Sequence, residues 1–398
     1  MSTAARRDPV IWACAAIGLY DVLQVVLLSL KGPLIGLNFD VLYPDFLVFH
    51  AAARAFFEGK LDIVYDLEAF TAYQNALYPD HWVTPVDFRP FLYPPLWLLL
   101  ILPFGLLAAP KAYPLFAALA AAVATPQQVS RIGVWGWLAV VTSPAALWVV
   151  LAGQNTFLSL ALFYGGLYTL PRQPWLAGML LGLLAYKPQL WVLVPIALLA
   201  SQQWRALAAM AVTVALLCLV SLSLFGGDFW RAFLDAAGEG ASPQFAETMY
   251  QRMSSNLTSL MAAVRLIGLP PGVAGGVQLA GAALAVAAVW IAFRRPGDND
   301  ARIALLATAT FLVSPYTLNY DMLLLMPAVV AFYRQGLRSG FLPLEQPIHV
   351  ALWLVPGLGV LLNDRHLPLM PVAIVLFGVV AWRRFRAKVE LPGAAGAR

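Results

Sequence analysis

The sequence predicts an all-α polytopic membrane protein, and composition is the first reason. Of its 398 residues, 61% are hydrophobic and only 11% are charged, whereas soluble proteins average about 25% charged residues. Apolar runs recur along the chain, and basic residues stand singly between them. Scattered basic residues are typical of membrane topology signals rather than of a phosphate-binding stripe, so we expect no nucleic-acid partner.

The first apolar run, Val10–Leu30, follows Arg6 and Arg7. It is long enough to cross about 30 Å of hydrocarbon, and no small-residue cleavage site follows it, so we expect a retained helix. Asp21 near its middle should be partnered or protonated. Together with the later runs it predicts about twelve transmembrane helices, several of them short enough to need tilts or half-helices. These later runs are Phe91–Ala108, Ile132–Ala152, Thr156–Leu170, Pro174–Tyr186, Gln189–Ala200, Trp204–Phe225, Val273–Phe293, Ile303–Pro315, Leu318–Tyr333, Pro347–Leu362 and Leu367–Trp382.

A shorter run, Ala112–Ala124, lies between Lys111 and Arg131. We interpret it as a re-entrant or surface segment with both flanks in the cytoplasm.

Two polar stretches interrupt the apolar pattern, at residues 31–90 and 226–272. The first contains helical patterns at Asp45–Glu58 and Leu67–Tyr78, and the aromatic residues of the earlier pattern recur on one face, as in helices that lie along a bilayer surface. We therefore expect one integral membrane domain over residues 1–398. The first stretch would be an extracytoplasmic loop with interfacial helices, and the second a further large extracytoplasmic segment.

The charges orient this arrangement. With both chain ends in the cytoplasm, most Lys and Arg residues fall on the cytoplasmic side, including the basic tail Arg383–Arg386, as the positive-inside rule requires. The opposite face is acidic. We expect a bacterial inner (plasma) membrane protein whose active site faces the extracytoplasmic side. Cys14 and Cys218 both lie in apolar runs, so neither a disulfide framework nor a thiolate metal site is indicated.

Asp45 is the candidate catalytic residue. Pro44 suits the first turn of a helix, and a carboxylate beside it lies in the positive field of the helix N-terminus. The simpler alternative is an ordinary first-turn acid on an interfacial helix.

Further polar residues interrupt apolar runs on the same predicted side of the membrane. Prolines accompany several of them and free backbone groups, which is tolerated only where protein or a water-filled cavity satisfies those groups. We therefore expect a cavity at the outer membrane boundary, next to Asp45. The residues are Arg89, Tyr93, Gln154, Asn155, Lys187, Asn319, Tyr320 and Asp321.

Lys187 lies inside an apolar sequence, where an ammonium needs an anion, and a lipid-linked phosphate is a natural one at that depth. The alternative is a loop marker between two short helices. Gln154 and Asn155 could instead be amides that join helices, and Asp321 could form an ion pair with a neighbouring helix. The sequence shows neither metal-ligand spacing nor a Gly-rich phosphate loop, so we expect no metal and no cofactor.

Several short motifs follow one another in a recognisable order. They are Asp45-x-x-x-Phe-x-Ala-Ala with Gly59 and Tyr65-Asp66, Phe91-Leu92-Tyr93-Pro94-Pro95-Leu96, Gly153-Gln154-Asn155, Gly178 with Lys187-Pro188, Ser254-Ser255-Asn256-Leu257-Thr258-Ser259-Leu260 and Ser314-Pro315-Tyr316. In this order the chain resembles glycosyltransferase family 87, integral membrane enzymes of the GT-C superfamily. The resemblance implies a GT-C fold, a polyprenyl-phosphate sugar donor, metal-independent catalysis and Asp45 as general base. Many members carry a Trp and then a His after Ser-Pro, where this chain has Leu318 and Tyr320, so the identity of the sugar is not carried over.

We therefore expect a membrane glycosyltransferase that moves a mannose-like hexose from a polyprenyl-phosphate donor to an extracytoplasmic lipid or glycan acceptor, with inversion. Such a donor already contains a leaving group, so the enzyme needs a base for the acceptor hydroxyl and cations for the departing phosphate. A transporter or lipid flippase, which would show midplane charges and hydropathy repeats, and a non-catalytic scaffold are the alternatives. The expected donor-binding residues are Arg89, Tyr93, Gln154, Asn155, Lys187, Arg252, Asn256, Asn319, Tyr320 and Asp321.

Overall fold

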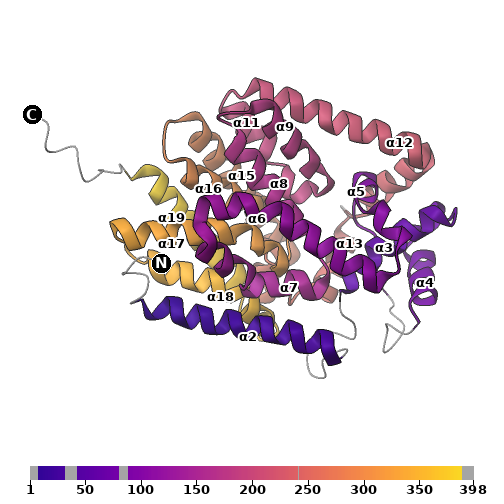
Figure 1. Ribbon diagram of the computed structural model, residues 1–398, viewed down its shortest axis with the longest axis horizontal. Helices are drawn as coiled ribbons and strands as arrows, with labels where there is room; N and C mark the ends of the chain where they lie inside the picture. Colours follow the sequence, from indigo (N-terminus) through magenta and orange to yellow (C-terminus); the bar gives the residue numbers. More distant parts are fainter. Residues whose placement is uncertain (1–7, 32–42, 80–87, 241, 388–398) are drawn as a thin grey trace, which may run out of the picture.

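The computed structural model describes residues 8–31, 43–79, 88–240 and 242–387. Within these ranges the chain is helical, and no strand is formed (Figure 1). The extended backbone there includes one isolated antiparallel bridge, between Leu257 and Leu318. The predicted all-α class is therefore confirmed for this part of the chain.

The helices follow one another with short connections, and 3-10 turns extend or separate several of them. Their bounds are α2 Pro9–Lys31, α3 Pro44–Phe57, η1 Leu61–Ile63, α4 Leu67–Leu77, α5 Pro95–Ile101, η2 Leu102–Leu106, α6 Ala109–Val141, α7 Pro144–Ala152, α8 Thr156–Thr169, α9 Pro174–Leu183, η3 Leu184–Tyr186, α10 Pro188–Trp191, α11 Val194–Ala200, α12 Trp204–Gly240, α13 Pro243–Met253, α14 Leu260–Leu266, α15 Pro271–Arg294, α16 Asn299–Val313, η4 Asn319–Leu325, α17 Met326–Ser339, α18 Glu345–Asn363 and α19 Leu369–Arg386.

The two helices expected in the first polar stretch are present as α3 and α4, with bounds within one residue of the prediction. Their surroundings differ from the prediction, however. Phe46 and Phe49 of α3 are 0% and 2% exposed and pack on Phe116 and Trp97 respectively. The expectation that this apolar face lies along a bilayer surface is wrong, because other helices of the protein cover it.

Two long helices reverse direction at a glycine. Gly133 in α6 has φ 72° and Gly226 in α12 has φ 80°, a left-handed backbone that glycine adopts without strain. The Trp137 indole donates to Thr125 Oγ1 at 3.1 Å, although twelve residues of straight helix would separate them by about 18 Å. Each glycine therefore joins two helical arms at a sharp change of direction, and across the bend in α12 the Trp230 indole donates to Ser221 Oγ.

The helix that contains Ala112–Ala124 is longer than the predicted segment. That run is part of a longer helical arm in which Lys111 and Arg131 lie about 30 Å apart. The buried residues of this arm recur every four positions from Ala112 to Gln128, while Leu115, Leu119 and Val123 are exposed. The arm is therefore a long helix with one protein-facing stripe, and together with α7 it forms a broken span or a re-entrant loop.

The count of about twelve spans is not confirmed by helix length. Among the described residues, three helices are long and apolar enough to cross a membrane alone: α12, α15 and α18. A fourth span results if α6 and α7, bent by 63°, are counted as one. Several other predicted runs form helices of 10–17 residues, such as α8 and α9, which cross a bilayer only with local thinning or in combination.

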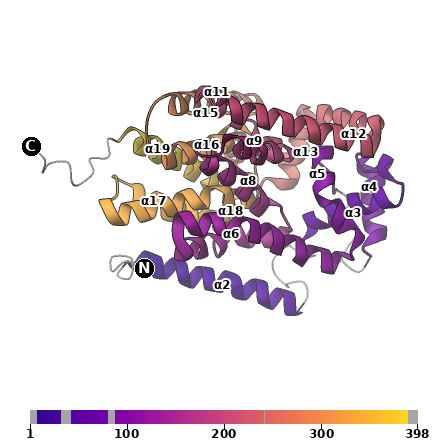
Figure 2. The same ribbon diagram turned by 45° about the horizontal axis from the view of Figure 1, so that its top comes forward.

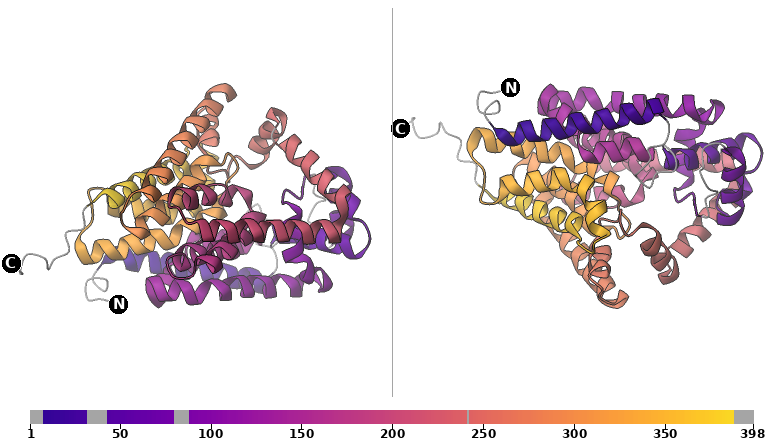
Figure 3. Two further views of the ribbon diagram at one scale, coloured as in Figure 1. Left: turned by 90° about the horizontal axis from the view of Figure 1, so that it is seen from above. Right: turned by 90° about the horizontal axis from the view of Figure 1, so that it is seen from below.

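Figures 1 and 2 show α2 along one side of the molecule and α12 along the opposite side. α3 and α4 gather at one end of the long axis, and α17 and α19 reach the other end (Figure 3). At this latter end the Tyr333 hydroxyl donates to Asp8 at 2.6 Å, and Arg384 holds Glu345 through two 2.6 Å bonds. The start of α2, the start of α18 and the end of α19 therefore share one end, opposite to Asp45.

Candidate active site

Asp45 lies in the first turn of α3. Tyr43 caps this helix with a left-handed backbone (φ 53°), and its N–H donates to Leu151 O at 2.7 Å. Gly153 (φ 76°) lies against the same turn, where a Cβ would come within 2.7 Å of Phe46 and Tyr43 Cβ atoms. Because only glycine permits this approach, the end of α7 lies directly beside Asp45.

A hydrogen-bond network surrounds the Asp45 carboxylate. Gln154 Nε2 donates to Asp45 Oδ2 at 2.7 Å and to the Tyr320 hydroxyl oxygen at 3.2 Å. Tyr93 Oη donates to Gln154 Oε1 at 3.1 Å, and Arg89 Nη1 lies 3.7 Å from Asp45 Oδ1. Three segments of the chain, at residues 89–93, 154 and 320, thus meet beside this carboxylate, and Gln154 holds its orientation.

The electrostatics of Asp45 have opposing parts. Burial raises the pKa of the Asp45 carboxyl, while the Arg89 guanidinium and the Gln154 amide act to lower it. The side chain nevertheless keeps 24% of its surface exposed, and that of Arg89 keeps 29%. The Asp45 carboxyl is therefore partly accessible, and the opposing effects on its pKa come from burial on one side and from Arg89 and Gln154 on the other.

Lys187 forms the centre of a second, fully buried network. Its ammonium donates to Asp321 Oδ1 at 2.6 Å and to Asn155 Oδ1 at 3.1 Å, and the Thr156 hydroxyl donates to the same Asp321 oxygen at 3.4 Å. The side chains of Lys187 and Asp321 are 1% and 2% exposed. The anion that Lys187 meets is therefore Asp321. This contact matches the ion-pair alternative for Asp321, and a contact of Lys187 with a lipid phosphate stays a prediction.

The two networks lie side by side. Gln154 and Asn155 are consecutive, and so are Tyr320 and Asp321. Within each pair, one residue belongs to the Asp45 network and the other to the Lys187 network. The Lys187 ammonium also lies 5.6 Å from the centre of the Tyr320 ring. A shift of the ion pair would therefore be transmitted to the hydroxyl that Gln154 contacts.

Three other predicted residues occupy the edge of this cluster. Asn319 N donates to Asn256 O at 2.9 Å, so the loop before α14 is fastened to the loop that carries Asp321. The Arg252 guanidinium lies over the Phe88 ring at 5.1 Å, next in sequence to Arg89. Asn319 and Asn256 thus connect to the site through their backbones, and Arg252 reaches it through the segment that holds Arg89.

The sequence did not single out Thr156 or Trp97. Trp97 is fully buried between Phe49 and Tyr186, and its Nε1 has no acceptor among the described residues. The Nδ2 atoms of Asn155 and Asn319 are also buried without a hydrogen-bond acceptor among the described residues. Buried donors without partners are rare and need an explanation. In the sequence, Thr156 could have been noticed because it follows Gln154 and Asn155 directly, and Trp97 because it ends the motif Pro94-Pro95-Leu96-Trp97.

No group of three or more His, Cys, Asp or Glu side chains that could hold a metal ion occurs within the described ranges. His50, on the same helix as Asp45, is buried and contacts Tyr78 Oη at 2.6 Å and Leu107 O at 2.8 Å. Burial lowers its pKa. It fastens α3 to α4 and η2 and does not reach Asp45.

Family comparison gives the class of protein. A model of glycosyltransferase family 87 matches residues 91–315, which is more than half of the chain. The chain therefore belongs to glycosyltransferase family 87, and its apolar helices are those of a membrane member of such a family. Neither the curated proteins nor the solved structures contain a match. Asp45 and Arg89 precede the matched segment, so their place beside Tyr93 and Gln154 comes from the fold alone.

Proposed function

We propose that this glycosyltransferase transfers a mannose-like hexose from a polyprenyl-phosphate donor to a lipid or glycan acceptor, with Asp45 as general base. The observation that carries the proposal is the position of Asp45: partly accessible, held by Gln154, and facing Arg89. A base is the group that such a donor requires from the enzyme, because the leaving group is already a phosphate.

In this proposal the two carboxylate oxygens of Asp45 have different tasks. Oδ2 accepts the Gln154 amide, so Oδ1 is the oxygen left for the acceptor hydroxyl. In the proposed step the acceptor proton moves to Oδ1 while the acceptor oxygen bonds to C1 of the sugar. The bond from C1 to the phosphate oxygen breaks, and polyprenyl phosphate leaves. One displacement of this kind inverts the anomeric centre.

The cations that stabilise the departing phosphate would be Arg89 and Arg252. Arg89 is partly exposed beside Asp45, and a guanidinium matches the geometry of phosphate oxygens. The buried ion pair of Lys187 with Asp321 would position Asn155 and Tyr320 rather than contact the phosphate. Tyr93, Asn155, Asn256 and Asn319 complete the proposed donor site.

The same proposal places the site outside the cell membrane. Asp45 lies at the end of the molecule opposite to Arg384 and Glu345. Basic residues favour the cytoplasmic side. The long polar stretch at 31–90 would therefore be extracytoplasmic, on a bacterial inner membrane.

The test is Asp45→Asn in the purified full-length protein, incubated with a panel of radiolabelled polyprenyl-phosphate sugars. The substitution keeps the size and the Gln154 contact but removes the proton acceptor, so we expect a loss of transfer of about 100- to 10,000-fold with donor binding retained. Asp62→Asn, an exposed carboxylate in η1, is the matched control and should stay active. Turnover near wild type in Asp45→Asn would contradict the assignment of the base.

A further inference from the structure

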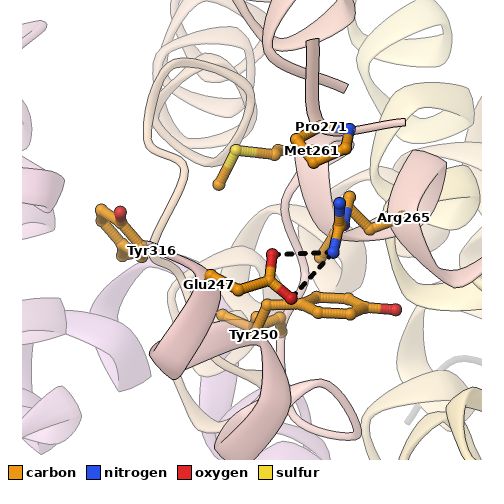
Figure 4. Close-up of a pocket in the computed structure, with 8 residues that line it drawn as sticks. Glu247, Tyr250, Met261, Arg265, Pro271 and Tyr316 are labelled. Carbon is orange, nitrogen blue, oxygen red and sulfur yellow. Dashed lines mark hydrogen bonds and ion pairs between the residues drawn. The ribbon is translucent and has the colours of Figure 1, made fainter. Parts of the chain in front are cut away.

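A separate cavity lies next to the loops that carry the site. It has a volume of about 170 Å³ and is bounded by α13, α14, the start of α15 and the loop before η4. Figure 4 shows Met261 and Pro271 on one side, Glu247 and Tyr250 on the opposite side, and Tyr316 at one end. Leu257, Ala262 and Arg265 complete its lining.

The charged residues of this cavity neutralise one another. Arg265 Nη2 donates to both oxygens of Glu247, at 3.0 and 2.7 Å, and the Arg265 guanidinium lies 4.9 Å from the centre of the Tyr250 ring. A guanidinium carries five N–H donors, and the pair engages those of Nη2. The cavity therefore offers hydrogen-bonding groups without net charge, which favours a neutral polar ligand over a phosphate.

Size and lining narrow the ligand further. A cavity of roughly 150 Å³ holds one six-membered ring, so about 170 Å³ suits a single ring. Met261 and Pro271 supply apolar surface, and Tyr316 supplies an aromatic ring with a polar hydroxyl. A pyranose has both an apolar C–H face and hydroxyl groups at its rim, and it matches this combination.

The cavity is connected to the active site through the backbone. Leu257, which lines it, forms the bridge to Leu318, and Thr258 Oγ1 donates to Thr317 Oγ1 at 2.8 Å. Tyr316 begins the segment that continues to Tyr320 and Asp321. A ligand in the cavity thus lies against the backbone segment 316–318, which leads directly to Tyr320 and Asp321 of the two networks.

We propose that this cavity binds a neutral pyranose ring of the acceptor, with Tyr316 as the stacking platform and the Arg265–Glu247 pair at its hydroxyl rim. The assignment of this ring to the acceptor rests on the function proposed above, whereas the binding of a neutral ring does not depend on that function. The ring could belong to a lipid-carried or to a free glycan, and the chemistry of recognition is the same for both.

The test measures binding and turnover separately, with the full-length protein in lipid nanodiscs. Saturation-transfer NMR with methyl α-D-mannopyranoside and with octyl α-D-mannopyranoside compares wild type, Tyr316→Ala, Tyr316→Phe and Tyr20→Ala. Tyr20 is an exposed tyrosine of α2 outside the cavity. We expect about tenfold weaker binding in Tyr316→Ala, because an aromatic contact is lost, and wild-type binding in the other two variants.

In the turnover assay, Tyr316→Ala should raise KM for the acceptor about tenfold while KM for the donor stays unchanged. Tyr316-dependent binding of the methyl glycoside supports a free glycan, and Tyr316-dependent binding of the octyl glycoside alone supports a lipid-carried one. The proposal would be overturned if both probes bound wild type and Tyr316→Ala equally. It would also be overturned if octanol displaced octyl α-D-mannopyranoside as well as methyl α-D-mannopyranoside does. If wild type consumed no polyprenyl-phosphate sugar, the proposed function would fail while the binding comparison still decided the occupant.

Discussion

At the scale of single residues, Arg89 has the largest effect among the groups that lower the pKa of Asp45. Burial raises this pKa, and Arg89 is the nearest charge that acts to lower it. A general base works in its ionised form, so the rate should rise with pH through the pKa of this carboxyl. Under the proposed function, Arg89 should therefore extend activity toward lower pH.

We expect Arg89→Gln to move the acid limb of the kcat/KM profile to higher pH. The substitution removes the positive charge that favours the carboxylate, and the effect of burial is then less opposed. Arg89→Lys should keep the limb near its wild-type position. The measurement is the pH dependence of initial transfer rates at subsaturating acceptor.

Arg54→Gln is the matched control for this profile. Arg54 lies on the same helix but pairs with Glu58 at 3.2 Å and is 38% exposed, so its removal should leave the acid limb in place. An acid limb that stayed fixed or moved to lower pH in Arg89→Gln would show that Asp45 is not the titrating base, or that Arg89 does not act on it.

Residue types were predictable from the sequence, but their partners were only partly so. A carboxylate after proline, amides at the end of an apolar run and a lysine within one all stand out against a hydrophobic chain. The bonds that join them span 109 residues from Asp45 to Gln154, 166 from Gln154 to Tyr320 and 134 from Lys187 to Asp321. Spacing carries no information over such separations, so the sequence could offer the contact of Lys187 with Asp321 only as one alternative.

At the scale of elements, the Lys187–Asp321 pair joins two connecting segments. Lys187 stands between η3 and α10, and Asp321 lies in η4. Thr156, at the start of α8, hydrogen-bonds to the same carboxylate. The pair thus connects the η3–α10 junction, η4 and the start of α8 next to the Asp45 network.

We expect Lys187→Met to destabilise the protein by about 3 to 5 kcal/mol, because it leaves the buried Asp321 carboxylate without its countercharge. The double variant Lys187→Met with Asp321→Leu should recover most of this loss. Thermal unfolding of the purified protein in detergent, followed by tryptophan fluorescence, measures both.

Lys60→Met serves as the control, since Lys60 is 51% exposed in its pair with Glu58 and exposed pairs contribute about 0–1 kcal/mol. If Lys187→Met unfolded like wild type but bound the donor poorly, the phosphate role expected from the sequence would be restored in place of the structural one.

Helix bounds followed from the sequence more closely than helix direction did. The runs Thr156–Leu170 and Pro174–Tyr186 agree with α8 and with α9 plus η3, because apolar length and proline boundaries are local signals. The reversals at Gly133 and Gly226 were not foreseen. Gly133 lies in an apolar stretch without a polar turn signal, whereas Gly226 is followed by Gly227 and Asp228, a turn signal that explains why the predicted run ends at Phe225.

At the scale of the whole molecule, polar chemistry is divided between two ends. One end of the molecule is formed by α3, whose first turn carries Asp45, and by α4. The other end holds the buried Glu345–Arg384 pair and the contact of Tyr333 with Asp8. Between them, the sides of the molecule expose apolar residues such as Leu216 and Leu219 of α12 and Leu284 of α15, as expected of surfaces that face lipid.

This division predicts the orientation in the membrane, and cysteine labelling tests it. In a background where Cys14 and Cys218 are replaced by alanine, Lys60→Cys should react with an impermeant thiol reagent added to intact cells. Arg338→Cys should react only after the cells are permeabilised. Lys60 lies just after α3, and Arg338 is an exposed residue in the last turn of α17, near the basic end. Retention of transfer activity in both variants is the control for correct folding. Labelling of position 338 alone in intact cells would invert the arrangement, because Asp45 and its networks would then face the cytoplasm.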